Sequence, residues 1–437
     1  MGVVLCIAGL LGARGFVRRS LGDGLGFLLF VGSLYGLARA HFLDGVTHFW
    51  FDAAVLGAYW GGLSSVLQVH SERTRGLRSW VLLLCGFPLL LILMSPFVDS
   101  QPVLIQLVGL RPAALFLPLI LFGAAMNLEQ WLRFSRWAAW LAIFCAIVAV
   151  AELVFGVDSF FPLSDVTRIL YASRDVGEGE FRIPSTFSSA HAYAGTMLGI
   201  LPVLVLRTRV PSCSGLLAWS AVAAASFGVL IAGARTPVLI LAVLAAVLLI
   251  GSAGSARQLV LLLVLGAGLA FVVPRFEQFK RIETLRDPEL VTERFESSVN
   301  LSVLDAIATY PLGRGLGSAF GTNIPYFLAN EARPQLGAES EYGRIALEEG
   351  VLGLILWLCF ICFTLIRDPR RLQVLGGLPD RMMYALCIAT WGQGLIGAGM
   401  LSAIPGSLIL FTQVGFLVAS CDRHLARSRP LLALKPA

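Results

Sequence analysis

The chain is dominated by a succession of apolar runs close to 20 residues long, and this feature leaves few folds open to it. Hydrophobic residues make up 57% of the 437 residues and charged residues only 14%, whereas a soluble domain carries about 25% charged residues. In lipid, only helices and closed barrels satisfy their backbone hydrogen bonds. Because the runs have the length of a membrane-spanning helix and lack the alternation of a barrel strand, the sequence predicts an all-α polytopic membrane protein.

These runs predict about 12 or 13 membrane-spanning helices. The first run, 3–13, is short and precedes several arginines, so it is either a first span or a half-inserted segment, and without an obvious cleavage site it is not read as a removed signal peptide. The other spans are expected at about 25–40, 49–69, 80–98, 112–126, 137–155, 188–206, 216–232, 237–250, 259–273, 345–366, 382–400 and 404–420. The predicted organisation is an N-terminal bundle at 1–273 with an outer loop at 156–186, a long loop at 274–343, and C-terminal helices with a tail at 344–437.

Positive charge marks alternate connections between the predicted spans. One set of connections carries Arg14, Arg18, Arg19, Arg73, Arg75, Arg78, Arg133, Arg136, Arg207, Arg209, Arg257, Arg367, Arg370, Arg371, Arg381, Arg423, Arg427, Arg429 and Lys435. The short connections at 41–48 and 401–404, on the other side, carry no lysine or arginine. Because short loops rich in lysine and arginine face the cytoplasm, the loops at 156–186 and 274–343 are predicted to face the outside. The net charge of +6 follows from this topology and indicates no nucleic-acid partner.

The eight cysteines lie mostly within apolar runs and show no metal-ligand spacing. We interpret them as small core residues. No metal and no cofactor is expected from the sequence.

The segment at 182–196 returns the chain from the outer loop to the membrane. Pro184 and the serines and threonines that follow it indicate a helix start, with candidate N-caps at Ser185, Thr186, Ser188 and Ser189. A helix N-terminus at the outer surface favours anions, and His191 is expected within its first turn or two. The segment is therefore either a capped helix with a satisfied histidine or a pocket wall for a charged head group that includes Arg182.

A tight turn at 232–237 joins two apolar helices around Arg235. An arginine so close to hydrocarbon is costly unless it meets an anion or a water-filled cavity. Snorkelling to lipid phosphates would satisfy it. We favour ligand binding, because a guanidinium is a bidentate clamp for phosphate.

The stretch at 310–354 ends the longest polar segment of the chain. It opens with three glycines around Arg314, namely Gly313, Gly315 and Gly317. The glycines permit a close approach of the backbone. A nucleotide-binding loop is excluded, because such a loop follows a strand and this chain is predicted to be helical.

Charged residues close the same stretch just before a helix expected from residue 345. Glu339 and Glu341 are candidate catalytic carboxylates, and Arg344 is a candidate substrate-binding residue. The helix dipole alone also favours carboxylates at this position, so a purely structural role is the alternative.

Together these motifs resemble the bacterial superfamily of O-antigen ligases and O-antigen polymerases, which assembles surface polysaccharide. The resemblance covers roughly 100–420. It depends on the order of an Arg-x-x-Ser-Thr-Phe re-entry, a tight hairpin with an arginine, a long loop, Tyr-Pro-Leu-Gly-x-Gly-Leu-Gly, and a final Glu-Ser-x-Tyr…Glu-x-Gly-Val-Leu-Gly helix.

The resemblance implies a glycosyltransferase that polymerises oligosaccharide repeat units carried on undecaprenyl diphosphate, at the periplasmic face of the bacterial inner membrane. Membrane lipids and a chain-length regulator are the further partners that it implies. Arg235 and Arg182 would stabilise the departing diphosphate, and Arg314 or, at the membrane exit, Arg275 would also grip it. His191 would contribute to substrate binding.

The final motif bears on the choice between polymerase and ligase. The ligase branch carries a histidine, then Asn, Ser or Gln, then nine residues, Gly, two residues and Gly. Here Ser340, Gly350 and Gly353 match, but Glu339 stands at the histidine position. This difference favours the polymerase side, with Glu339 or Glu341 as the base that takes the acceptor hydroxyl proton.

Two alternatives stay open. The first is the ligase, which would transfer a finished glycan to an acceptor. The second is a flippase or other transporter of lipid-linked glycans, for which charges near the bilayer midplane and repeated halves would be typical. The sequence shows few such charges and no evident repeat.

Overall fold

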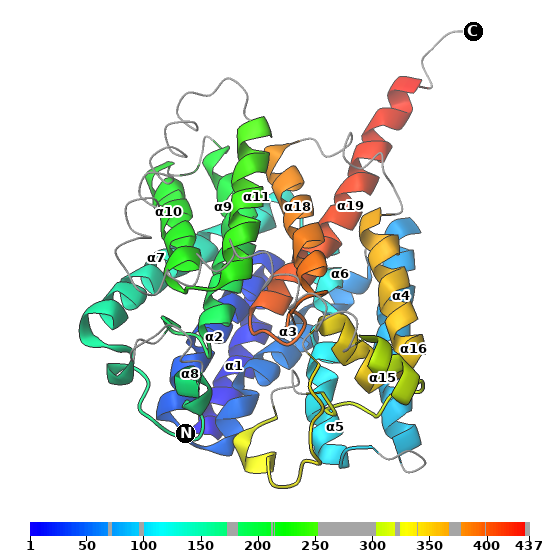
Figure 1. Cartoon of the computed structure of the whole chain (residues 1–437). Coiled ribbons are helices and arrows are strands. Elements are labelled where there is room, and N and C mark those ends of the chain that lie inside the picture. The colour runs from blue at the N-terminus through cyan, green and yellow to red at the C-terminus, as the bar shows by residue number, and fades with distance from the viewer. Residues whose placement is uncertain are drawn as a thin grey trace, which may run out of the picture. The chain divides into compact units, whose positions relative to one another are not determined.

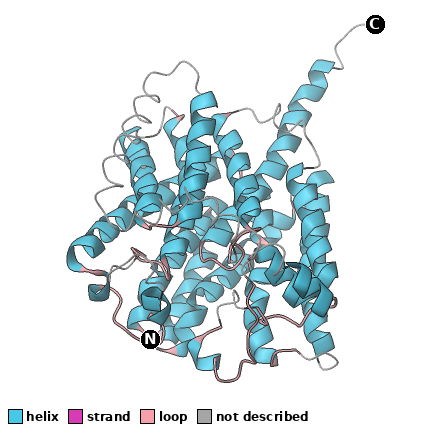
Figure 2. Ribbon diagram, viewed as in Figure 1, coloured by secondary structure: helices cyan, strands magenta, loops and turns pink. Residues whose placement is uncertain are grey.

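In the computed structural model, the regular secondary structure of the described part of the chain consists of helices joined by loops, as Figure 2 shows. The described residues are 1–68, 72–95, 100–172, 182–210, 213, 215–251, 303–319, 324–338, 340–366, 377–397 and 399–432. Within them, strand-like pairing is limited to an isolated bridge between Ala319 and Leu336. The predicted all-α class is therefore confirmed.

Six helices of the described part are long and apolar enough to cross a membrane. They are Leu21–His41, Thr74–Met94, Val103–Ala125, Leu128–Phe155, Ala190–Thr208 and Glu341–Ile366. Shorter apolar helices are Gly215–Ile231, Arg235–Leu248 and Gly406–Ser420. The prediction of a polytopic membrane protein is confirmed. The count of 12 or 13 stays a prediction, since the span expected at 259–273 lies outside the described residues.

The predicted starts of two spans were wrong. The span expected at 137–155 begins at Leu128. The span expected at 112–126 begins earlier, at Val103, and is not one regular helix. A helix at Val103–Leu110 passes into a π-helical turn at Arg111–Leu115, and a new helix runs over Leu119–Ala125. Two prolines explain the breaks, because proline lacks an N–H group and its ring clashes with the preceding turn; they are Pro112 and Pro118.

The chain divides into two compact units. Unit 1 comprises Met1–Gly61, Leu128–Phe295 and Ala403–Gly406, and unit 2 comprises Gly62–Asn127, Glu296–Ser402 and Ser407–Ala437. The division predicted from the sequence, at 1–273, 274–343 and 344–437, stays a prediction.

Unit 1 is built from long helices that pack side by side (Figure 1). Its main helices are α1 (Gly2–Arg19), α2 (Leu21–His41), α3 (Trp50–Leu67, whose last turns belong to unit 2), α7 (Leu128–Phe155), α9 (Ala190–Thr208), α10 (Gly215–Ile231) and α11 (Arg235–Gly251). The short elements are η1 (Gly45–Phe49), η4 (Val157–Ser159) and α8 (Arg168–Ala172). α10 packs against α7 and α9, and α2 packs against α1 and α7.

Unit 2 contains the stretch at 310–354, with its glycines and its charged residues. Its elements are α4 (Glu72–Met94), α5 (Val103–Leu110), η3 (Arg111–Leu115), α6 (Leu119–Ala125), α15 (Asp305–Thr309), η10 (Tyr326–Leu328), α16 (Glu341–Ile361), η11 (Cys362–Ile366), α18 (Leu378–Gln393) and α19 (Gly406–Leu432, whose first residue belongs to unit 1). α16 packs against α4 and α15, and α4 also contacts α5 and α6.

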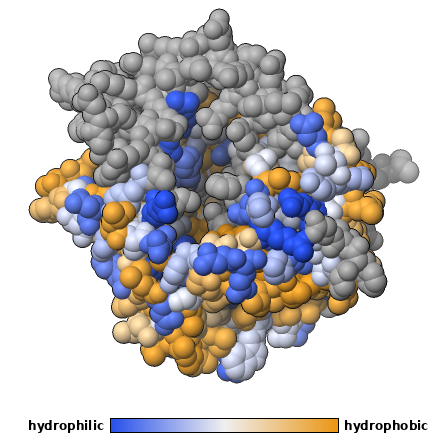
Figure 3. Space-filling view, turned by 60° about the horizontal axis from the view of Figure 1, so that its bottom comes forward, coloured by the Kyte–Doolittle hydropathy of each residue, from blue (hydrophilic) through white to orange (hydrophobic). Residues whose placement is uncertain are grey.

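Large apolar side chains are exposed on the long helices, and apolar residues (orange) are spread widely over the face shown in Figure 3. Leu82 is 73% exposed, Leu93 70% and Val154 70%. A soluble protein rarely exposes so many apolar side chains in contiguous patches. The surface is that of helices surrounded by lipid.

Candidate functional site

The first turn of α16 begins at a serine cap. Ser340 has an extended backbone, and its Oγ accepts a hydrogen bond from the Gly343 N–H at 2.9 Å. Such a cap satisfies one of the amide groups that a helix leaves unpaired at its start. The serine of the Glu-Ser-x-Tyr motif therefore fixes where α16 begins.

A buried ion network follows on one face of α16. The Arg344 side chain donates from Nε to Glu341 Oε1 at 2.8 Å and from Nη1 to Glu348 Oε2 at 2.6 Å. Its Nη2 also lies 2.7 Å from Glu341 Oε1. Spacings of three and four residues place these side chains on the same face, and all three are fully buried. Removing one partner of such a network leaves an uncompensated buried charge.

Each carboxylate of the network also accepts hydrogen bonds from the backbone of a loop. Glu341 Oε2 accepts hydrogen bonds from the backbone N–H groups of Gly399 and Met400. Glu348 Oε1 accepts from the N–H groups of Gly317 at 3.0 Å and Ala319 at 3.3 Å. The network thus joins the start of α16 to the turn after α18 and to the glycine-rich loop.

The glycine-rich loop at 310–319 docks on a break in α16. Gly350 has φ +71° inside the helix. Next to this break, Val351 donates its backbone N–H to the Pro311 carbonyl at 3.0 Å, and Arg314 donates its own to the Leu347 carbonyl at 2.7 Å. The break exposes carbonyls of α16 that the amides of the loop then satisfy.

The glycines of this loop are required by its backbone. Gly313, Gly315 and Gly317 have φ values of +83°, +87° and +81°, which L-residues with a side chain rarely adopt. Space is also lacking, because a Cβ on Gly313 would lie 2.7 Å from the Glu348 carbonyl oxygen. The Tyr-Pro-Leu-Gly-x-Gly-Leu-Gly and Glu-x-Gly motifs are thus two halves of one docked structure.

The loop at 324–338 folds onto the same structure. Gln335 Nε2 donates to the carbonyls of Gly317 at 3.2 Å and Ala319 at 2.7 Å. The Gln101 side chain, just before α5, exchanges hydrogen bonds with the Arg333 backbone at 3.0 and 2.9 Å. The described part of the long polar segment is therefore an ordered wall beside the start of α16.

In unit 1 the Arg-x-x-Ser-Thr-Phe segment runs into the helical bundle. Ser185 donates its backbone N–H to Glu152 Oε2 at 2.8 Å and its Oγ–H to the Cys145 carbonyl at 2.9 Å. The Thr186 carbonyl accepts from the Leu37 N–H at 3.2 Å. Ser185 adopts φ +51°, a strained conformation for a residue with a side chain. Groups from α2 and α7 therefore hold this segment in place.

Two of the predicted substrate-binding residues, His191 and Arg182, meet at the start of α9. Ser189 is its N-cap and accepts from the Ala192 N–H at 3.2 Å, so one of the four candidate caps holds this position. His191 is exposed in the first turn, as predicted. The Arg182 guanidinium lies beside its ring, with Nη1 3.3 Å from Nε2 and 3.5 Å from Nδ1.

The structure brings together Arg182 with His191 in unit 1, and Glu341 with Arg344 in unit 2. Arg235 is the half-buried first residue of α11, after a turn in which Gly233 has φ +63°.

In unit 2, Arg314 is half-buried, with its guanidinium 5.7 Å from the centre of the Tyr310 ring. The predicted residues Glu339 and Arg275 lie outside the described residues. In the described part of the chain, no group of three or more His, Cys, Asp or Glu side chains is arranged to hold a metal ion.

Two carboxylates in this structure were not assigned a role from the sequence. Glu348 follows Arg344 at the four-residue spacing of a helix face, which could have indicated the pair. Glu152 is 1% exposed within the apolar α7. A carboxylate in a membrane span needs a partner, but nothing in the sequence identified that partner as the backbone of Ser185.

Residues 220–358 match a protein-family model described as O-antigen ligase. The matched region extends from α10 to the last turn of α16, and so includes Arg235, the glycine-rich loop and the ion network. None of the curated proteins compared with the chain matches it. The family match supports an O-antigen ligase- or polymerase-like family, as the motifs predicted.

Proposed function

We propose that this protein, of an O-antigen ligase- or polymerase-like family, polymerises oligosaccharide repeat units carried on undecaprenyl diphosphate. Its function in surface polysaccharide assembly follows from the family. The observation that favours a polymerase over a ligase is Glu339, which stands where the ligase branch carries a histidine. The reaction would take place at the periplasmic face of the inner membrane.

The chemistry requires a base and a cation. The hydroxyl of an acceptor unit attacks the anomeric carbon of the donor, the bond to the diphosphate oxygen breaks, and the hydroxyl loses its proton. We assign the base to Glu339, which directly precedes the Ser340 cap. Both Glu341 oxygens already accept hydrogen bonds from Arg344 or backbone amides, which supports a positioning role for Glu341 and Arg344.

The leaving group is a diphosphate, which arginines stabilise without a metal ion. We assign this role to Arg235, with Arg182 and His191 as further substrate-binding residues. Arg314 or Arg275 would add a second positive charge. The contact between Arg182 and His191 supports this assignment, because it gathers two nitrogen-rich side chains at the start of α9.

The ligase is the second candidate, because the family description names that activity. A ligase would transfer a finished glycan to an acceptor molecule. In that case Glu339 would take the catalytic role of the histidine that the ligase branch carries.

The test is the polysaccharide profile of a deletion strain complemented with wild type, Glu339→Gln or Arg235→Ala. Matched controls are Glu331→Gln and Arg168→Ala, since both side chains are exposed. Single repeat units on their carrier, with failure of both variants at normal membrane levels, would support the polymerase. Complete but unattached polymer would identify a ligase. Normal polymer from both variants would refute the assigned site and favour the transporter.

A further inference from the structure

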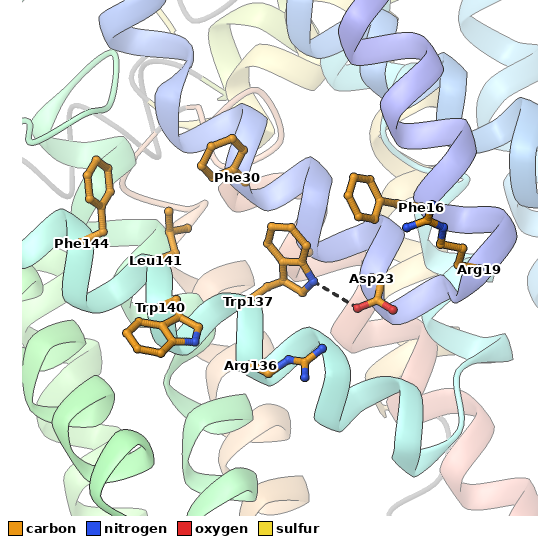
Figure 4. Close-up of a pocket in the computed structure, with 10 residues that line it drawn as sticks. Phe16, Arg19, Asp23, Phe30, Arg136, Trp137, Trp140, Leu141 and Phe144 are labelled. Carbon is orange, nitrogen blue, oxygen red and sulfur yellow. Dashed lines mark hydrogen bonds between the residues drawn. The ribbon is translucent and has the colours of Figure 1, made fainter. Parts of the chain in front are cut away.

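A groove of about 530 Å³ lies in unit 1 at the junction of α1, α2 and α7 (Figure 4). Its walls come from side chains such as Phe16 on α1, Phe30 on α2, and Trp137 and Phe144 on α7. No residue assigned to glycan transfer lines it.

One end of the groove is aromatic and open. Between the two ends, Trp137 is held edge-on against Phe16 with ring centres 5.6 Å apart, and the centre of the Phe30 ring lies 6.5 Å from that of Trp137 (Figure 4). Further along α7, Trp140 is 60% exposed and Phe144 43% exposed. Exposed aromatic side chains of this kind are typical of surfaces that meet lipid near the head-group region.

The other end of the groove is charged, and its carboxylate is already engaged. Asp23 accepts hydrogen bonds from Trp137 Nε1 at 3.1 Å and from Arg133 at 3.3 Å. Arg133 also pairs with Glu129 at 2.8 Å. One arginine thus serves both carboxylates.

Two exposed arginines remain at this end. Arg19 and Arg136 line the groove beside Asp23 and form no ion pair with any residue that the structure describes. The Arg19 guanidinium lies 5.8 Å from the centre of the Phe16 ring, which keeps it at the groove. Counting Arg133 and its two carboxylates as well, three positive charges face two negative ones. The groove therefore has spare positive charge for an external anion.

The spacing of these features fits an amphiphile. Arg136 and Phe144 are eight residues apart on α7, which corresponds to about 12 Å along a helix. A ligand that satisfies both ends needs an anionic head and an apolar chain. The connections that carry Arg19 and Arg136 belong to the set predicted to be cytoplasmic, and basic pockets between helices on that side bind anionic head groups.

We propose that this groove binds an anionic phospholipid of the cytoplasmic leaflet, with its phosphate between Arg19 and Arg136 and an acyl chain along Trp140 and Phe144. The proposal does not depend on the glycan-transfer site. The acyl chain of a zwitterionic lipid would pack against the same aromatic side chains, but the positive charge of its head group would be repelled by the two arginines. The groove should therefore select for net negative charge.

The test is native mass spectrometry of the full-length protein in detergent, titrated with phosphatidylglycerol or with phosphatidylcholine of the same acyl chains. Wild type should retain phosphatidylglycerol preferentially. Arg19→Gln with Arg136→Gln should reduce its affinity by about 25-fold, because each arginine near a head group contributes about fivefold. Arg18→Gln with Arg209→Gln is the matched control, since both side chains are exposed and neither lines the groove.

Trp140→Ala tests the apolar half of the groove and should weaken both lipids alike, while Ile147→Ala, another exposed residue of α7, should not. Equal binding of the two lipids by wild type, or unchanged preference in the double arginine variant, would overturn the proposal. A dimer that Trp140→Ala converts to monomer without any change in lipid binding would also overturn it, and would identify the groove as an interface between two copies.

Discussion

The start of α16 and the start of α9 both carry charged residues predicted to act on substrate, but the two regions treat charge in opposite ways. Along α16, Arg344 and its carboxylates are fully buried and paired. At α9, His191 is exposed and Arg182 contacts its ring. The difference shows that a charged residue does not bind substrate merely because it lies in a functional motif. Buried, paired charges hold loops in place, and accessible ones can meet a ligand.

The largest expected effect comes from removing the centre of the buried network. Arg344→Met would leave two buried carboxylates without a counter-charge, and should lower the free energy of unfolding by about 3–5 kcal/mol. Thermal unfolding in detergent micelles would measure it. Combining Arg344→Met with Glu341→Gln and Glu348→Gln should recover part of the loss, because the two carboxylates that pair with Arg344 are then replaced by neutral amides. A mild effect of Arg344→Met alone would contradict the structural role.

The next effect concerns the break in α16. Gly350→Ala should cost about 2 kcal/mol, because a Cβ would lie 2.5 Å from the Leu312 carbonyl carbon and φ is +71°. Gly86→Ala in α4 is the matched control. No atom lies within 4 Å of a Cβ at that position, so the change should stabilise the helix by about 0.5–1 kcal/mol. Similar changes in melting temperature for both variants would argue against the docked loop.

A smaller loss of stability, equal for the two variants, is expected when either helix cap is removed. Ser340→Ala and Ser189→Ala each remove a hydroxyl that accepts from a backbone amide, and each should cost about 1 kcal/mol. Thermal unfolding of the two variants compares the regions directly. A much larger loss at one of them would mean that its serine does more than cap the helix.

The smallest effect on stability is expected at Arg182. Arg182→Gln changes a side chain that pairs with no carboxylate among the described residues, so stability should change by less than about 0.5 kcal/mol. If Arg182 binds the diphosphate, polymer should nevertheless disappear from the complemented deletion strain. Unaltered polymer together with unaltered stability would remove Arg182 from the proposed site.

The sequence predicted the fold class and the positions of the six membrane-length helices of the described part approximately, because the hydrophobic length of a helix is a local property. Local signals also placed His191 in the first turn of α9 and Arg235 at the start of α11. The expected start of a span at residue 112 was wrong, because apolar residues from Val103 continue the helix before Pro112.

The docking of the glycine-rich loop could not be predicted in the same way. The glycines indicated an unusual backbone but not its partner, which lies more than 30 residues further along the chain. Likewise, the motif identified Glu341 and Arg344 as charged residues at a helix start, and only the three-dimensional contacts show that each already has a partner. Pairings between distant backbone groups leave little trace in residue type.

The ion network of α16 has a mechanical consequence. Glu341 binds the turn at Gly399 and Met400, Glu348 binds the glycine-rich loop, and Arg344 links the two carboxylates. The network therefore links two loops that are far apart in the sequence. Because Arg344 contacts both carboxylates, we expect a shift of one loop to be accompanied by a shift of the other.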